Sequence, residues 1–120
     1  MSRIIYTDTD RDYPKGRYEG AISVTKMRNA MRKAGYELVN ARNERRNNVL
    51  EGSFGFIKDP VSGRLVYFSA DASACFKSDE VLYRTAKHDH DYIGGINRYA
   101  NFKELAESVR NLFAHPELWG

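Results

Sequence analysis

Two apolar stretches joined by a strong turn constrain the fold of this chain most. Residues 49–57 and 64–70 carry bulky apolar side chains at adjacent positions, as in Phe56-Ile57 and in Leu65 to Phe68. Between them Pro60 fixes one backbone angle and Gly63 permits a positive φ, which is typical of a turn. Adjacent apolar residues point to opposite faces of a strand. The pattern therefore predicts an antiparallel pair of central strands that is covered on both faces, or is covered by helices on one face and by a partner on the other.

An amphipathic pattern lies before this pair, in residues 22–34. Ser23 is placed to accept a hydrogen bond as the N-cap of a helix, and Gly35 suits the left-handed residue that ends one. At 100° per residue the apolar side chains fall within an arc of roughly 120°. They are Val24, Met27, Ala30, Met31 and Ala34.

A second helix is predicted near the C-terminus. Asn101 is its expected N-cap, with Glu104 completing a capping box, and Pro116 forbids its continuation. Trp119 is expected to fold back onto the core. The apolar side chains again lie within roughly 100° of one face. They are Phe102, Leu105, Ala106, Val109, Leu112 and Phe113.

The order of these elements predicts the fold class. Further β-prone segments occur at residues 3–7, 36–39 and 80–86, and polar loops are expected at residues 40–48 and 87–99. Strands outnumber helices and follow one another directly. We therefore expect one domain over residues 1–120, of the α+β class. It would contain an antiparallel sheet of about four strands with two helices packed on one face, a two-layer sandwich.

Composition indicates an ordered protein of the cytoplasm. Hydrophobic residues make up 42% of the chain, which is enough for one core in 120 residues. Cys75 is the only cysteine, so an internal disulfide is excluded, and its apolar neighbours favour a buried, inert thiol. No apolar run is long enough to span a membrane. The N-terminus lacks the features of a signal peptide, and we expect a cytoplasmic location.

Positive charge is concentrated in residues 26–46. They hold seven Lys or Arg and two Glu, a net charge of +5, whereas the whole chain, with 19 Lys or Arg and 16 Asp or Glu, carries +3. Local positive charge is typical of surfaces that bind polyanions, although helices also carry Lys and Arg simply to stay solvated. The predicted contacts to nucleic acid or to an acidic partner are Lys26, Arg28, Arg32, Lys33, Arg42, Arg45 and Arg46. Secondary contact candidates are Tyr92, Arg98 and Tyr99.

One cluster has the residue types of a metal site. In the segment His88-Asp89-His90-Asp91, alternate side chains of an extended chain point the same way. His88, His90 and Asp91 are therefore candidate ligands for zinc or another divalent ion, with one more ligand from elsewhere. The alternative is a solvated loop. Asp8, Asp10 and Asp12 have the spacing of a calcium loop, but Tyr13 replaces its obligatory glycine, so a solvated loop is predicted there also.

These observations leave three hypotheses about function. The first is a small non-enzymatic binding module whose basic helix face and Arg-rich loop engage nucleic acid or a nucleoprotein. The second is a protein-binding inhibitor or adaptor of the small kind that phages and plasmids carry, acting for example on a host nucleic-acid-processing or defence complex. The third is a metal-dependent hydrolase at the 88–91 loop. No cofactor motif is present, so a cofactor other than such a metal is not expected.

Overall fold

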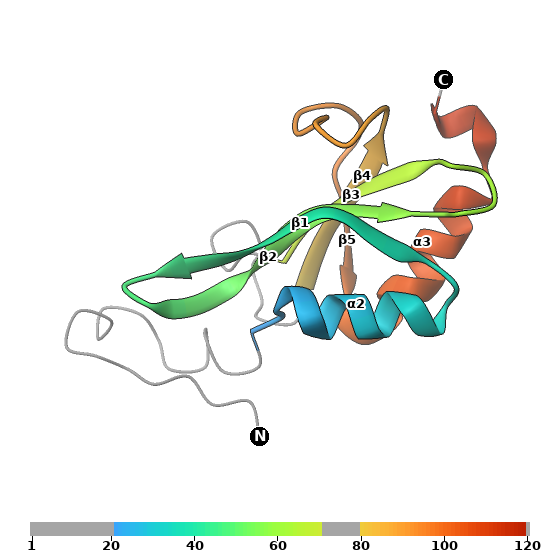
Figure 1. The fold of residues 1–120 in the computed structure, drawn as a ribbon. Coiled ribbons are helices and arrows are strands. Elements are labelled where there is room, and N and C mark those ends of the chain that lie inside the picture. Colours follow the sequence, from blue (N-terminus) through green and yellow to red (C-terminus); the bar gives the residue numbers. More distant parts are fainter. Residues whose placement is uncertain (1–20, 71–79, 120) are drawn as a thin grey trace.

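The computed structural model describes residues 21–70 and 80–119, and its architecture is α+β. The strands form one antiparallel sheet in chain order, and a helix stands before and after them. Figure 1 shows this arrangement. The predicted class is confirmed, with five strands where about four were expected. The elements are α2 (Val24–Lys33), β1 (Glu37–Arg46), β2 (Val49–Lys58), β3 (Leu65–Ser69), β4 (Glu80–Ala86), β5 (Arg98–Asn101), η2 (Phe102–Glu104), α3 (Leu105–Phe113) and η3 (Pro116–Trp119).

Several predictions fall outside the described residues. They are the strand at residues 3–7, the polar segment with Asp8, Asp10 and Asp12, and the setting of Cys75.

The first helix has the ends that its sequence predicts. The Ser23 hydroxyl accepts a hydrogen bond from the Lys26 amide at 3.1 Å, so it caps the first turn. Gly35 has a φ of 91°, and the chain leaves the helix there. The buried side of α2 is formed by Val24, Met27 and Met31.

Strand β1 corrects the prediction of a polar loop at residues 40–48. The strand runs on to Arg46, which pairs with Val49, so only Asn47 and Asn48 connect it to β2. Both have a positive φ, 52° and 66°, as in the type I′ turn that matches the twist of paired strands. Asn adopts this conformation at little cost. The polar residues before it are strand residues with solvent-exposed side chains rather than loop residues.

The central strand pair is confirmed, and its register explains the adjacent apolar residues. Ile57 pairs with Val66 on one face of the sheet, and Phe56 pairs with Tyr67 on the other. The turn between the strands ends at Gly63, whose φ is 78°. Both faces of β2 and β3 therefore carry large side chains, as the sequence predicted.

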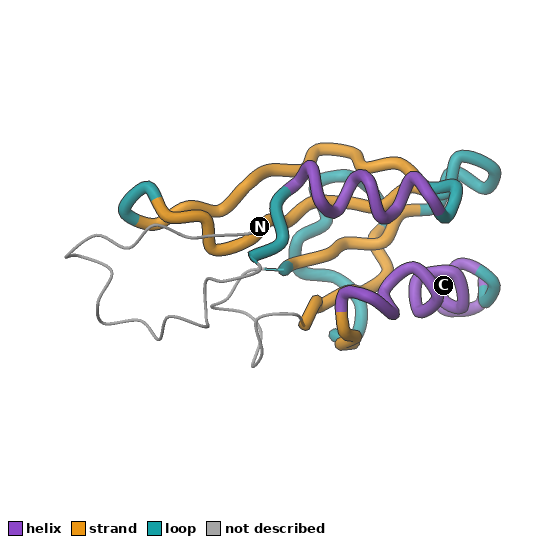
Figure 2. Tube along the Cα trace, turned by 90° about the horizontal axis from the view of Figure 1, so that it is seen from below, coloured by secondary structure: helices purple, strands orange, loops and turns teal. Residues whose placement is uncertain are grey.

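Both helices pack on the same face of the sheet. Met27 and Met31 of α2 belong to one continuous cluster of buried side chains with residues of α3 and of the sheet. Figure 2 shows the two helices on the side of the sheet that faces the viewer. The sheet contributes Ile57, Val66, Phe68, Val81 and Tyr83 to the cluster, and α3 contributes Leu105, Val109, Leu112 and Phe113.

The C-terminal part confirms the second helix but corrects its start. The chain enters it through the η2 turn, and Asn101 makes no side-chain capping bond, so the predicted capping box does not form. Asn101 instead ends β5, the short strand that pairs with β4 where a loop was predicted. Trp119 folds back as expected: its Nε1 donates to the Leu65 carbonyl at 3.1 Å and its ring stacks on Phe113.

No helix in the described parts of the chain is long and apolar enough to cross a membrane.

Candidate nucleic-acid interface

Helix α2 and strand β1 are joined side by side. Asn43 accepts a hydrogen bond from the Val24 amide at 2.8 Å through its Oδ1, so a residue of β1 satisfies the first free amide of α2. Beyond this contact the β1–β2 hairpin, residues 42–54, projects past the helix (Figure 1). We call this part of the hairpin the arm. The segment that carries most of the positive charge thus lies on a helix and the edge strand next to it. By alternation along β1, Arg45 lies on the same side as Asn43, toward the helix. Arg42 instead pairs with Phe54, whose ring contacts Tyr92 on the other face of the sheet.

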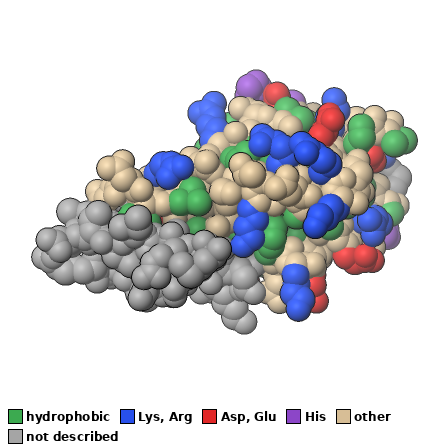
Figure 3. All heavy atoms as spheres, turned by 60° about the horizontal axis from the view of Figure 1, so that its bottom comes forward, with side chains coloured by type: hydrophobic (Ala, Val, Ile, Leu, Met, Phe, Trp, Pro, Cys, Tyr) green, Lys and Arg blue, Asp and Glu red, His purple; other side chains and the backbone are tan. Residues whose placement is uncertain are grey.

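Within residues 21–70 and 80–119, the described arginine side chains of α2 and the arm form no ion pair with a carboxylate. Arg32, Arg42 and Arg45 are exposed and Arg28 is half-buried. Among described side chains the ion pairs within 4.0 Å are His90–Asp89 and Arg110–Glu107, and neither involves these four arginines. Lys and Arg side chains gather on the face seen from below the molecule (Figure 3). No described carboxylate therefore competes with an external ligand for these arginines.

The structure divides the cations of α2 into two rows. Arg28 and Arg32 are one turn apart and point toward the start of β1, where both line the same hollow. Lys26 and Lys33 lie about 100–160° away from the two arginines round the helix. The Lys26 ammonium sits 5.3 Å from the centre of the Phe102 ring, on the side of α3. The predicted basic helix face thus divides into an arginine row beside β1 and Lys26 on the side of α3.

The hollow beside Arg28 and Arg32 has a volume of about 390 Å³. It lies between the C-terminal end of α2, the start of β1 and the turn between β2 and β3. Two guanidinium groups, one carboxylate and apolar groups meet there. Its lining is completed by Gly35, Tyr36, Glu37, Leu38 and Pro60.

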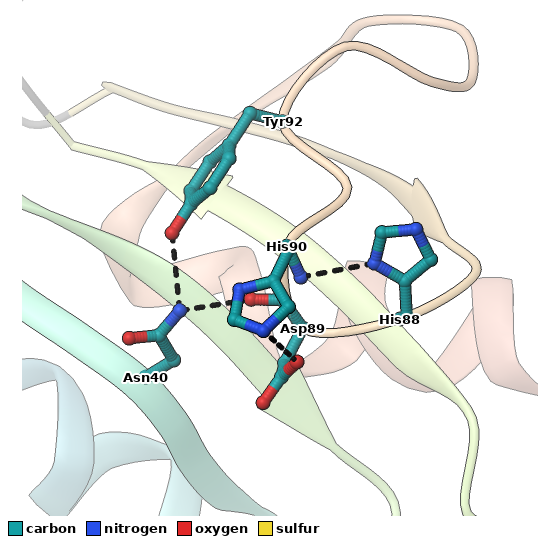
Figure 4. A network of polar contacts seen from close by, with 5 residues as sticks. All are labelled: Asn40, His88, Asp89, His90 and Tyr92. Carbon is teal, nitrogen blue, oxygen red and sulfur yellow. Dashed lines mark hydrogen bonds and ion pairs between the residues drawn. The ribbon is translucent and has the colours of Figure 1, made fainter.

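On the other face of the sheet, a loop of residues 87–97 is held by β1. The chain bulges at Asn40, whose φ is 49°, and its amide Nδ2 donates to the Asp89 carbonyl at 2.8 Å and to the Tyr92 hydroxyl at 3.0 Å. Figure 4 shows Asn40 reaching up to the loop between these two acceptors. The Tyr92 ring packs against Phe54, Phe56 and Tyr67.

Arg84, on strand β4, also holds this loop in place. The side chain is buried, and its guanidinium donates to the Tyr92 carbonyl and to Asn97 Oδ1. Its centre lies 4.3 Å from the centre of the Tyr67 ring. Among the described residues no carboxylate pairs with Arg84, and its Nε has no hydrogen-bond partner. A charged group that is desolvated in this way is stabilised by the carbonyl, the amide oxygen and the aromatic face.

The secondary contact candidates do not join the basic surface. Arg98 and Tyr99 lie on β5, which is the opposite edge of the sheet from β1. Tyr92 faces the aromatic cluster over β2 and β3. The side chain of Arg46 lies outside what the structure describes.

The candidate metal ligands are used in other ways. The Asp91 carboxylate accepts hydrogen bonds from the amides of Lys87 and Gly94, and the first of these is the main cause that lowers the pKa of Asp91. His88 Nδ1 accepts from the His90 amide, and His90 pairs with Asp89. Within the described ranges no three His, Cys, Asp or Glu side chains are placed to hold an ion. The metal-site hypothesis gains no support from this geometry.

Three residues that organise the site were not predicted, namely Asn40, Asn43 and Arg84. Each forms hydrogen bonds with residues that are distant in the sequence or across the sheet, so no local sequence pattern predicts its role. The only local signal is that Asn tolerates a positive φ, and the same holds for Asn47 and Asn48.

Comparisons with protein-family models, with curated protein sequences and with solved structures give no match to this chain.

Proposed function

We propose that this protein is a non-enzymatic nucleic-acid-binding module that contacts phosphates through α2 and the arm. The observation that carries the proposal is the set of four arginines on adjoining elements that have no carboxylate partner among the described residues. They are Arg28, Arg32, Arg42 and Arg45. Guanidinium groups readily donate hydrogen bonds to phosphate oxygens, often two at a time.

The dimensions of the surface support an extended ligand. From Leu38 to Arg45 a strand rises roughly 20 Å. The arginines of α2 stand beside one end of this path and Arg45 lies near the other end, while Arg42 points to the opposite face of this edge strand. Such a path is long enough for several nucleotides, and contacts of this kind give affinity rather than sequence preference.

Salt dependence tests the proposal. Binding to fluorescently labelled DNA and RNA, measured by anisotropy, should weaken as salt rises. If four phosphates are contacted on a duplex, a fourfold increase in salt should reduce the affinity roughly a hundredfold. Absence of binding at low salt, or binding that salt leaves unchanged, would contradict the proposal.

Two pairs of residues on the same helix give a matched control. The double variants R28Q/R32Q and K26Q/K33Q remove the same charge from α2, but from the two different rows. We expect R28Q/R32Q and the arm variant R42Q/R45Q to weaken binding and to flatten its salt dependence. K26Q/K33Q should retain most of the affinity, since Lys26 sits beside Phe102 and the helical spacing places Lys33 at least about 100° from Arg28 and Arg32. Equal loss in both helix variants would assign the effect to overall charge.

A second candidate function, binding to a protein, is favoured by one observation. Ile93 is 95% exposed and Ile96 is 74% exposed, in a loop that Asn40 and Arg84 hold in place. A fixed loop with apolar side chains at its tip suits contact with an apolar pocket of another protein, because little entropy is lost on binding. This is the inhibitor or adaptor hypothesis, located on the loop instead of the basic surface.

The two functions can be separated in one purification. Nuclease-treated extracts of the producing cell are passed over the wild type, the R42Q/R45Q variant and an I93S/I96S variant. A stoichiometric partner that is retained by R42Q/R45Q and lost by I93S/I96S would favour protein binding through the loop. Loss of all bound material on nuclease treatment would favour the nucleic-acid module.

A further inference from the structure

We propose that the hollow beside Arg28 and Arg32 holds a nucleobase of single-stranded nucleic acid. The inference rests on the proposed function and specifies its ligand. It starts from the cavity of about 390 Å³, which is within the range of small-ligand sites and lies at the end of the basic surface.

The chemistry of the lining suits a flat, uncharged ring with polar edges better than a phosphate. Arg28 and Arg32 supply donors and flat cationic faces, and neither has a partner among the described residues. The positive charge of these arginines is partly offset by the carboxylate of Glu37. It is also offset by the C-terminal end of α2, just before Gly35, which carries a partial negative charge. Both would oppose a phosphate in the hollow and leave a base unaffected.

The remaining lining offers apolar surface. Tyr36, Leu38 and Pro60 line the hollow, and Tyr36 is kept in position by its contact with Phe113, at 5.1 Å between ring centres. Bases of single strands bind in this manner, stacked on aromatic, apolar or guanidinium surfaces while cations follow the backbone. In a duplex the bases are paired and stacked inside, so they cannot enter a hollow without being flipped out.

The arrangement along β1 completes the argument. The hollow lies at the start of β1 and Arg45 near its end on the same side, so a strand whose base enters the hollow can place its backbone along β1 toward Arg45. The basic surface then supplies affinity for any nucleic acid. The hollow supplies preference for an unpaired one.

A matched pair of substitutions in one turn tests this site. Pro60 lines the hollow, whereas Val61, the next residue, does not line it and is 94% exposed. P60E and V61E therefore add the same charge to the same turn, one inside the hollow and one outside it. Affinities are measured by anisotropy for labelled 12-nucleotide single strands of DNA and RNA and for the DNA duplex of the same sequence, at one salt concentration. Circular dichroism first establishes that both variants are folded.

The wild type should bind single strands roughly tenfold more tightly than the duplex, the size expected for one stacked base. P60E should lose this preference, while V61E should keep it, and the two variants should bind the duplex equally. Equal single-strand affinity of P60E and V61E, or a wild type that prefers the duplex, would overturn the inference and leave the proposed function standing. Absence of binding to all probes would overturn both.

Photo-crosslinking of the wild type avoids any dependence on variants. Single strands that carry 5-iodouracil are irradiated in the complex, and the crosslinked peptide is identified by mass spectrometry. The inference expects crosslinks at Tyr36 or its neighbours in the hollow. Crosslinks confined to the arm would overturn it.

Discussion

Asn40 fulfils a backbone role and a side-chain role at one position. Its φ of 49° lets β1 bulge, and its amide donates to the Asp89 carbonyl and to the Tyr92 hydroxyl. Asn is one of the few residues other than Gly that adopts a positive φ readily, and its amide group carries two donors. The bulge in the strand and the position of the loop on the sheet are therefore set by the same side chain.

Two substitutions of Asn40 separate these roles. N40G keeps the backbone freedom and loses the two hydrogen bonds, so the free energy of unfolding should fall by about 1 kcal/mol. N40A also forces a Cβ into the left-handed conformation without a polar group to stabilise it, and the loss should reach about 2 kcal/mol. Urea titrations followed by circular dichroism give both values. Equal losses in N40G and N40A would show that the backbone conformation carries no cost.

Asp91 makes the loop sensitive to acid. The Lys87 amide, followed by smaller contributions that include the Gly94 amide and the charge of His88, lowers the pKa of this carboxyl below its ordinary value of 3.8. A carboxyl with a lowered folded-state pKa contributes stability above its ordinary pKa, and this contribution is lost as the pH falls through the folded value. D91N should therefore be less stable than the wild type at pH 7, and the difference should narrow below about pH 4. Urea midpoints at pH 7 and pH 3 test this, and a difference that stays constant would contradict it.

At the level of elements, the bulge of β1 requires Gly55 on the neighbouring strand. A Cβ at Gly55 would lie 2.5 Å from Ala41 Cα, which is backbone and cannot move aside. We expect G55A to destabilise the protein by about 3 kcal/mol, as overpacking does. G63A is the control: Gly63 has a φ of 78° but open space around it, so only backbone strain of about 1 kcal/mol is expected. The midpoints of thermal unfolding rank the two, and G63A as damaging as G55A would contradict the role of the close contact.

The elements show which sequence signals are sufficient. The ends of α2 were predicted because Ser23 and Gly35 act locally, and the β2–β3 pair because its apolar residues and its turn are contiguous. Residues 40–48 were predicted as a loop because their exposed Arg, Asn and Glu side chains show no alternation of apolar and polar residues. β5 was missed because it has only four residues, none of them buried.

The candidate site was predictable only in part. The charged residues were identified from their local excess, but the structure brings only Arg28 and Arg32 to one hollow and places Arg42 on the opposite face of the sheet. Their division into two rows depends on where α3 packs, since Lys26 turns to Phe102. The hollow exists because Pro60, in the turn between β2 and β3, lies close to Tyr36, in the turn between α2 and β1, and both line it. Such meetings are set by tertiary packing and leave no mark in a local pattern.

For the whole molecule, one continuous core predicts one cooperative unit. The cluster of buried residues joins α2 and α3 with the strands between them. Trp119, the only tryptophan, connects α3 to β3, because it stacks on Phe113 and donates to the Leu65 carbonyl. Neither end of the protein can unfold on its own without disrupting the buried contacts of this shared core.

The tryptophan makes this expectation measurable. Emission of Trp119 reports the contact between the C-terminal turn and β3, whereas circular dichroism reports the backbone of all elements. In a urea titration both signals should change at the same midpoint, as in two-state unfolding of a single domain. A change of Trp119 emission at lower urea, before the dichroism, would mean that the C-terminal turn detaches first. The substitutions at Asn40, Gly55 and Asp91 would then have to be judged by dichroism alone, because the fluorescence would not follow the core that holds the basic surface.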